Sequence, residues 1–296
     1  MPELNENHGG SNCSAVPQMR ERGLRIVLLL HEQTDDKADV ALMSSYDAVL
    51  ELMARAAIVL VSPKFAENIG SAARTAANMG ISQLILVCRE MPDRDRMLRL
   101  ATAKAAHLID NLEHHQELGE ALAPFGWVLG TSARQGRKRT TVNSPRQLMG
   151  EILPQLANNR VALLFGPEDR GLANEELRYC NQITTIPTVD FSSLNLAQAV
   201  AILCHELHYS VLEAVHQNGL PKAAPRQGNK QELEAMFAHV EEVLQAIGFL
   251  KDKDDDYWMK SIRRFLGRIG LKAKEIKIIR GVCRQLLWRD DQLRQK

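Results

Sequence analysis

Three polar segments of the chain each follow a short apolar stretch and lead into a helical pattern. In the last of them, Ser193-Leu194-Asn195, a hydroxyl and an amide stand where a long apolar helix begins. The first backbone N–H groups of a helix have no intrahelical partner, so they supply further hydrogen-bond donors at this point. This gathering of polar groups at the end of a β-branched strand predicts a ligand-binding site.

The elements that must position these segments alternate between strand and helix from Ala57 onward. Apolar stretches predict strands over residues 58–61, 83–87, 127–130, 161–165 and 183–186. Helices are predicted over residues 69–79 and 196–217, and another begins with Ser144 as N-cap and Pro145 as first residue. Such alternation predicts an α/β fold with a mainly parallel sheet and helices on both faces.

The N-terminal part of the chain, residues 1–56, is an extension without the motifs found later. Its polar stretch 5–18 indicates partial disorder, whereas 24–30 is consistent with a strand and 40–53 with a helix. One interpretation places the true start near Met53. Because the motif pattern starts at Ile58 and the leader has no glycine loop or basic cluster, we expect residues 1–52 to be dispensable.

The C-terminal part is predicted to be helical. Residues 218–229 have the Gly, Pro, Lys and Gln composition of a linker, and helical patterns follow over 231–247, 257–269 and 273–288. From Lys260 to Arg289 the chain carries ten basic residues against one acid. A chain of formal net charge +1 therefore has a basic helical end, which favours nucleic-acid binding.

The composition excludes several classes of protein. Hydrophobic residues make up 45% and charged residues 25%, and no apolar run reaches the roughly 18 residues that span a bilayer. The five cysteines are far apart and form no C-x-x-C pair, which predicts reduced thiols in a cytoplasmic protein. His205 and His208 lack the H-E-x-x-H spacing, so no metal site is expected.

The three segments occur in a recognisable order. They read Asn68-Ile69-Gly70-Ser71-Ala72-Ala73-Arg74, then Leu164-Phe165-Gly166-Pro167-Glu168-Asp169-Arg170-Gly171-Leu172, then the stretch from Ile186 to Ala197 that contains Ser193-Leu194-Asn195. Together they resemble the TrmH family of SPOUT RNA ribose 2′-O-methyltransferases. The C-terminal helices, with Ile262-Arg263-Arg264 and Ile279-Arg280-Gly281, resemble the extension of the TrmJ subfamily, so the resemblance covers residues 57–287.

The resemblance implies a fold and a cofactor. Residues 57–217 would form a SPOUT methyltransferase domain with a C-terminal trefoil knot, and 230–296 would form a helical tRNA-binding extension. The usual glycine signature for dinucleotides is absent, so a nucleotide cofactor would be held in another way. The resemblance implies that S-adenosylmethionine lies among three loops. The implied cofactor-binding residues are Gly130, Thr131, Ser132, Phe165, Gly166, Gly171, Ile186, Ser193, Leu194, Asn195 and Ala197.

The resemblance also implies roles in methyl transfer to a ribose 2′-hydroxyl. The implied catalytic residues are Asn68, Arg74, Glu168, Ser193 and Asn195. Because a guanidinium stays protonated, Arg74 suits stabilisation of the oxyanion or positioning of a phosphate better than general base catalysis. Glu168 would orient Arg74 through a charge-assisted hydrogen bond.

The implied substrate is tRNA, methylated on cytidine or uridine 32 of the anticodon loop by a homodimer. Candidate RNA-binding residues are Arg134, Arg137, Lys138, Arg139, Arg263, Arg264 and Arg280. In the loop before Asn68 the chain reads Pro63-Lys64-Phe65-Ala66-Glu67, which departs from the subfamily. Glu67 beside the site therefore leaves the choice of nucleotide open.

Simpler interpretations of the same residues remain. Asn68 or Ser193 alone could be a helix N-cap, Arg74 a solvated charge, and Glu168 a residue that favours the following helix. An rRNA 2′-O-methyltransferase of the same fold is an alternative function. A non-catalytic RNA-binding or assembly factor is another, although retention of the five candidate catalytic residues argues against it.

Overall fold

A six-stranded parallel sheet forms the centre of the molecule. The computed structural model describes residues 36–132, 144–189, 194–218, 222–250 and 255–294, and residues 49–296 form one compact unit. The strands are β1 (Ala56–Val61), β2 (Gln83–Val87), β3 (Glu113–His115), β4 (Trp127–Thr131), β5 (Val161–Phe165) and β6 (Gln182–Thr184). Their order is β3-β2-β1-β5-β4-β6, and every neighbouring pair is parallel. The predicted parallel α/β fold is confirmed.

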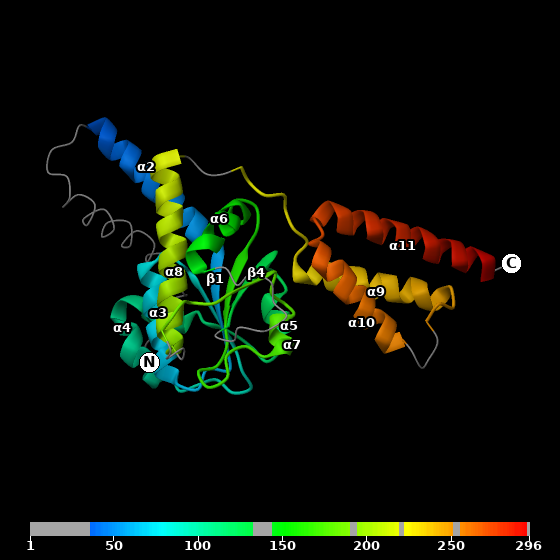
Figure 1. Cartoon of the computed structure of the whole chain (residues 1–296), viewed down its shortest axis with the longest axis horizontal. Helices are drawn as coiled ribbons and strands as arrows, with labels where there is room; N and C mark the ends of the chain where they lie inside the picture. Colours follow the sequence, from blue (N-terminus) through cyan, green and yellow to red (C-terminus); the bar gives the residue numbers. More distant parts are fainter. Residues whose placement is uncertain (1–35, 133–143, 190–193, 219–221, 251–254, 295–296) are drawn as a thin grey trace, which may run out of the picture. The chain divides into compact units, whose positions relative to one another are not determined.

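Helices cover both faces of the sheet, as predicted (Figure 1). They are α2 (Asp36–Met53), α3 (Ala66–Asn78), α4 (Arg94–Asp110), α5 (Leu118–Leu122), α6 (Pro145–Leu156), α7 (Asn174–Leu177) and α8 (Leu196–Glu213), which continues into the π-helix η1 (Ala214–Asn218). Ile58 and Leu60 of β1 face the larger core cluster with α3, α4, α6 and α8. Ala57 and Val59 face the smaller one with α5 and α7. Burial on both faces explains why β1 is continuously apolar.

The strand order reverses between β1 and β5, since β2 and β3 extend to one side of β1 and β5, β4 and β6 to the other. Because all strands are parallel, their carboxyl ends meet at one edge. Ligands of open α/β sheets bind at this edge, where the order reverses. Asn68 follows β1 and Glu168 follows β5, so the topology places both candidates at this point.

Helix α4 is an element that the sequence pattern did not predict, and it contains a break. Asp93 caps its N-terminus by accepting from the Arg96 backbone N–H, 2.8 Å away. At Thr102 the backbone turns to φ 63° and ψ 162°, a region that only glycine adopts readily. A β-branched residue there costs roughly 1–3 kcal/mol, so the surrounding packing must hold the break in place.

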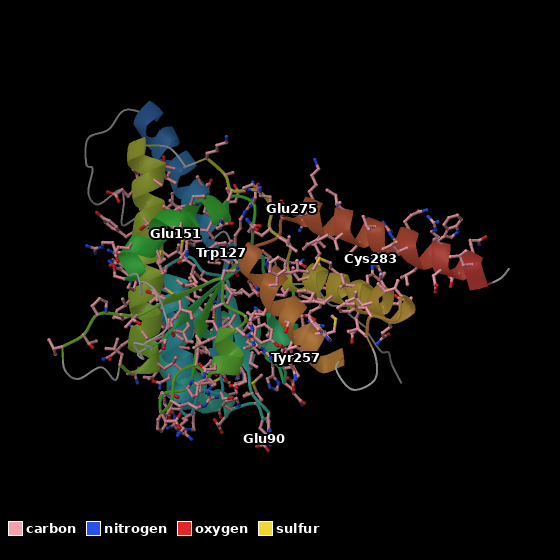
Figure 2. The ribbon with its side chains drawn as sticks, turned by 45° about the vertical axis from the view of Figure 1, so that its right-hand side comes forward. Glu90, Trp127, Glu151, Tyr257, Glu275 and Cys283 are labelled. Atoms are coloured by element: carbon pink, nitrogen blue, oxygen red, sulfur yellow. The ribbon has the colours of Figure 1, made fainter. Side chains whose placement is uncertain are left out.

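The C-terminal helices are α9 (Lys230–Ala246), α10 (Asp255–Ile269) and α11 (Ala273–Arg294), in agreement with the three predicted helices. Met236 and Phe237 of α9 pack against Leu271 and Ile276 in a core of their own. Cys283 of α11 is also buried (Figure 2). The contacts between these helices thus form a small hydrophobic core separate from that of the sheet.

The predicted linker is tied to its neighbours where it is described. Ala224 N–H donates to the Pro154 carbonyl oxygen, 2.9 Å away, and Gln227 N–H donates to Asn159 Oδ1, 2.7 Å away. Gln227 also forms a β-bridge with Lys272. The domain boundaries stay predictions.

Several expectations fall outside the described residues. The strand at 24–30 and the disorder at 5–18 lie in the first 35 residues. The trefoil knot stays a prediction, because residues 133–143 and 190–193 are not described. Within the described ranges, no helix has the length and apolar character needed to cross a membrane.

Candidate active site

Three elements meet through hydrogen bonds at the carboxyl edge of the sheet. Asn68 Nδ2 donates to Glu168 Oε1, 2.5 Å away, and Asn195 Nδ2 donates to Asn68 Oδ1, 3.0 Å away. The other oxygen of Glu168 accepts from the Lys64 backbone N–H at 2.8 Å. Asn68 is only 8% exposed. The structure therefore joins three of the predicted site residues, from α3, the loop after β5 and the start of α8.

The structure rejects two of the simpler interpretations. The N-cap of α3 is Phe65, whereas Asn68 is the third residue inside the helix. Glu168 is not at the start of the helix that follows it, because the N-cap of α7 is Ala173. Its carboxylate instead accepts from Lys64 beside the start of α3, where a negative charge is favoured by the helix dipole.

Asn195 has two roles in the structure. Its Oδ1 accepts from the Ala197 backbone N–H at 2.8 Å, which makes it the N-cap of α8. Its Nδ2 is then directed to Asn68. Capping thus fixes the amide that reaches the site. Ser193 lies outside the described residues.

The acidic residues around the network are paired. Lys64 Nζ lies 2.7 Å from Asp169 Oδ2, and this hydrogen bond lowers the pKa of the Asp169 carboxyl. Arg96 donates to both oxygens of Glu67, at 2.9 and 3.1 Å, and this contact lowers the pKa of Glu67. Glu67, which departs from the subfamily pattern, therefore carries a charge that Arg96 neutralises.

Arg74 is not brought to this network within one chain. It follows Asn68 by six residues on α3, and a rotation of about 100° per residue places the two on different sides of the helix. The hydrogen bonds of Glu168 in the described structure go to Asn68 and Lys64, so the predicted contact between Glu168 and Arg74 is not formed. Arg74 instead lines a pocket beside α4.

The ends of the three strands that lead into the predicted cofactor loops lie side by side. Ser132 N–H donates to the Thr184 carbonyl oxygen at 3.0 Å, and Thr185 Oγ1 donates to the Ser132 carbonyl oxygen at 2.6 Å. Thr131 Oγ1 donates to the Leu164 carbonyl oxygen at 3.3 Å. The ends of β4, β5 and β6 are therefore held together by neutral groups, which suits recognition of a nucleoside through backbone amides and carbonyls.

Two of the predicted cofactor glycines are required by the packing of the chain itself. A Cβ on Gly166 would lie 2.3 Å from the Gly171 carbonyl carbon, and one on Gly130 would lie 2.4 Å from Cys180 Sγ. Gly171 has a φ of +64°. Compact folding of the loops thus explains these glycines without a direct contact to a cofactor.

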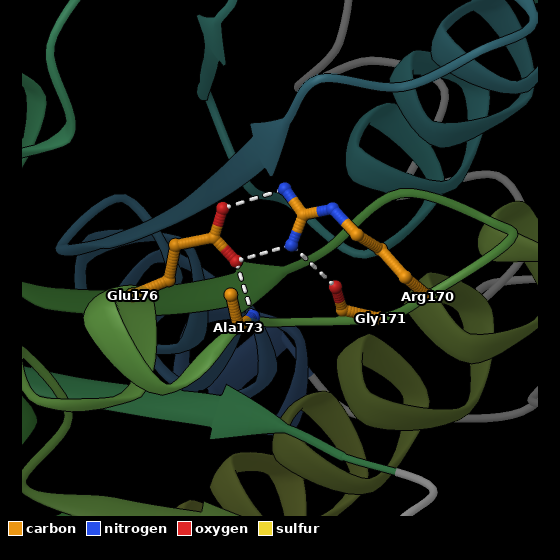
Figure 3. Close-up of polar contacts among 4 residues, drawn as sticks. All are labelled: Arg170, Gly171, Ala173 and Glu176. Atoms are coloured by element: carbon orange, nitrogen blue, oxygen red, sulfur yellow. Dashed lines mark hydrogen bonds and ion pairs between the residues drawn. The ribbon is translucent and has the colours of Figure 1, made fainter.

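An ion pair that the sequence analysis missed closes the loop after β5 (Figure 3). Arg170 donates to both oxygens of Glu176, at 3.1 and 2.9 Å, and to the Gly171 carbonyl oxygen at 3.2 Å. Glu176 also accepts from the Ala173 backbone N–H at 2.5 Å. Burial alone would raise the pKa of Glu176, but the bonds to Arg170 and Ala173 lower it overall.

Two of the three described RNA-binding candidates have partners within the C-terminal helices. Arg263 Nη1 lies 2.5 Å from Glu234 Oε2, and its guanidinium stacks on Phe237 at 4.7 Å from the ring centre. Arg280 Nε donates to His239 Nδ1 at 3.4 Å. Arg264 is exposed. Arg134, Arg137, Lys138 and Arg139 lie outside the described residues.

Comparison with known proteins identifies two matching families. Residues 55–205 match the SpoU rRNA Methylase family, and residues 231–296 match the C-terminal domain of the tRNA methyltransferase TrmJ. A tRNA (cytidine/uridine/adenosine-2′-O-)-methyltransferase TrmJ from Pseudomonas aeruginosa is 38% identical over 78% of this chain and 93% of its own length. A tRNA (cytidine/uridine-2′-O-)-methyltransferase TrmJ from Escherichia coli is 34% identical over 76% of this chain and 92% of its own length.

A solved structure extends the similarity to the fold. The crystal structure of TrmJ from Z. mobilis has a TM-score of 0.63 and 30% sequence identity, covering 78% of this chain and 98% of the other. The match thus extends over nearly the whole length of that relative.

Proposed function

This chain belongs to the SpoU methylase family and carries the TrmJ C-terminal domain, and we propose on this basis that it methylates a ribose 2′-hydroxyl of tRNA. The observation that carries the proposal is the network of Asn68, Glu168 and Asn195 at the carboxyl edge of the sheet. It lies where three family motifs, far apart in sequence, meet. S-adenosylmethionine is the methyl donor in this assignment, and it supplies an electrophilic methyl group.

The residues present fit this cofactor. The loops after β4, β5 and β6 offer neutral backbone groups held together by Ser132, Thr131 and Thr185. Residues Gly130 to Ser132, Phe165 to Gly171, and Ile186 to Ala197 would hold it. The pair of Arg170 and Glu176 keeps the middle loop folded, so the backbone groups of this loop are ordered before any ligand binds.

The chain's own side chains would position the ribose. Glu168 fixes the amide of Asn68, and Asn195 fixes the same amide from the other side. Each of these groups is held at both ends, so little reorganisation is needed when a substrate hydroxyl arrives. Arg74 would supply positive charge for the developing oxyanion or for a neighbouring phosphate.

A homodimer accounts for the position of Arg74. Within one chain Arg74 and Asn68 lie on different sides of α3. We therefore place Arg74 of one protomer near the substrate site of its partner. In this arrangement both protomers of the dimer contribute residues to each site.

The proposed target is cytidine or uridine 32 of the tRNA anticodon loop, in the cytoplasm. The TrmJ C-terminal domain at 231–296 supports tRNA as substrate, and the subfamily resemblance supports position 32. Exposed cations in these helices, such as Arg264 and Arg284, suit contacts to the phosphate backbone.

Methyl transfer from labelled S-adenosylmethionine to defined RNAs tests the proposal. The substrates are tRNA transcripts with C, U, A or G at position 32, the same tRNA with a 2′-deoxyribose at 32, and ribosomal RNA. We expect label in tRNA with C32 or U32 and none in the deoxy control. Preferential labelling of ribosomal RNA, or undiminished labelling of the deoxy tRNA, would contradict the assignment.

A further inference from the structure

A pocket of about 400 Å³ lies between α3 and α4. Its lining residues are Arg74, Ala77 and Asn78 of α3, and Thr102, Ala103, Lys104 and Ala105 of α4. This volume falls within the range of small-molecule sites. Two cations and no carboxylate line it, so the pocket has a positive potential.

The two cations of the pocket differ from two arginines of α4 in having no carboxylate partner among the described residues. Arg94 is paired with Asp110, and Arg96 is paired with Glu67. Arg74 and Lys104 are exposed, and neither forms an ion pair with any residue in the described ranges. Their charge is therefore available to a ligand.

The backbone of the pocket is held in an unusual conformation. Thr102 has a φ of 63°, and Ala103, Lys104 and Ala105 form the first turn of α4 after this break. Close packing of α3 against α4 supports the break, because a Cβ on Gly70 would lie 1.9 Å from the Met97 carbonyl oxygen. The first N–H groups of a helical turn lack intrahelical partners. Strained residues cluster at ligand sites, and here the strain places such a turn at the pocket.

We propose that this pocket binds a phosphate of the substrate RNA backbone between Arg74 and Lys104. Arg74 offers a planar pair of donors and Lys104 a point charge, a combination that suits a phosphodiester. Lys104 is thus a positioning residue that fixes the RNA relative to the methylation site. The inference rests on the proposed function, because it takes RNA as the ligand.

The affinity of the full-length protein for tRNA, measured without S-adenosylmethionine over a series of KCl concentrations, tests this inference. Lys104→Ala should weaken binding on the order of tenfold, as expected for loss of a charge-assisted bond. The slope of log affinity against log salt should fall by about 0.7–0.9, the contribution of one phosphate. Lys104→Arg should restore both, and Lys222→Ala, which removes an exposed lysine outside the pocket, should change neither.

Steady-state kinetics separate positioning from chemistry. Lys104→Ala should raise KM for tRNA about tenfold and leave kcat at saturating tRNA within about twofold.

Equal salt slopes for Lys104→Ala and Lys222→Ala would overturn the inference. The inference would also be overturned if Lys104→Ala lost binding of inorganic phosphate but kept the wild-type salt dependence of tRNA affinity. Failure of the wild type to methylate any tRNA would refute the proposed function alone, because the binding series does not depend on turnover.

Discussion

Glu168 connects two segments of the candidate site through its two carboxylate oxygens. One accepts from Asn68 and the other from the Lys64 backbone N–H. Both contacts join residues about a hundred positions apart, so they depend on the fold and on no local motif. The Glu168 carboxylate, held by the Lys64 N–H, therefore orients the Asn68 amide.

Glu168→Gln should lower kcat for methyl transfer at least tenfold while leaving the affinity for S-adenosylmethionine within about threefold. A glutamine amide has one acceptor oxygen, so it leaves one of the two N–H donors without its partner, at a cost of about 1–3 kcal/mol. Enzyme kinetics and calorimetry measure the two quantities. Asp169→Asn is the matched control, since the neighbouring Asp169 carboxylate forms an exposed ion pair with Lys64. Equal kcat for the two variants would refute the role of Glu168.

Arg74→Ala should lower kcat/KM on the order of 100-fold or more, because loss of a donor to a developing oxyanion or phosphate has this effect. The affinity for S-adenosylmethionine should not change, since the proposed cofactor loops lie on other elements. Isothermal titration checks the binding, and single-turnover assays check the transfer. Activity within threefold of the wild type would exclude Arg74 from catalysis and positioning.

At the scale of elements, the loop after β5 depends on the pair of Arg170 and Glu176 (Figure 3). Glu176 has a lowered pKa in the folded protein. Its contribution to stability is therefore present above its ordinary pKa of 4.5 and is lost as the pH falls through the lowered value. The loop should loosen in this acidic range.

Glu176→Gln should reduce this pH dependence. A partly exposed pair contributes about 1 kcal/mol or less after screening by solvent, so the variant should melt about 2–4 °C lower at pH 7. Below pH 4 the Tm values of the wild type and of Glu176→Gln should converge. Thermal unfolding at a series of pH values measures this difference, and a constant gap from pH 7 to pH 3 would contradict the explanation.

Helix α2 contributes to the stability of the sheet domain. Residues before Met53 were expected to be dispensable, but Val49 and Leu52 of α2 are buried in the larger core cluster. Removal of a buried Val and Leu forfeits roughly 1.5–3 kcal/mol each. Chains that begin at Ser45 and at Met53 should therefore differ in the free energy of unfolding by several kcal/mol. Equal urea midpoints would restore the original expectation.

At the scale of the whole molecule, tRNA affinity is assigned to exposed cations of the C-terminal helices. Arg264→Ala combined with Arg284→Ala should weaken tRNA binding and lower the salt slope by about 1.4–1.8, as expected for two phosphate contacts. Both side chains are exposed, so the fold should be retained. Anisotropy measurements provide the test, with Lys222→Ala as control. An unchanged slope would mean that these helices serve stability or another partner.

The local pattern determined much of this protein without reference to its structure. Apolar stretches predicted five of the six strands, and the capping residue Ser144 marked the start of a helix, because these signals act over a few neighbouring residues. Three short motifs also indicated the family. The short strand β3 and the broken helix α4 escaped prediction, since three residues carry little periodicity and a break at Thr102 interrupts it.

Which motif residues meet depends on how the elements pack. The tertiary structure brought Glu168 to Asn68, turned Arg74 away toward α4, and paired Glu67 with Arg96. Each of these contacts depends on the strand order and on the packing of α3 against α4, which no local sequence signal encodes. Periodicity and capping specify elements one at a time, whereas distances between elements arise from burial of all their apolar faces together.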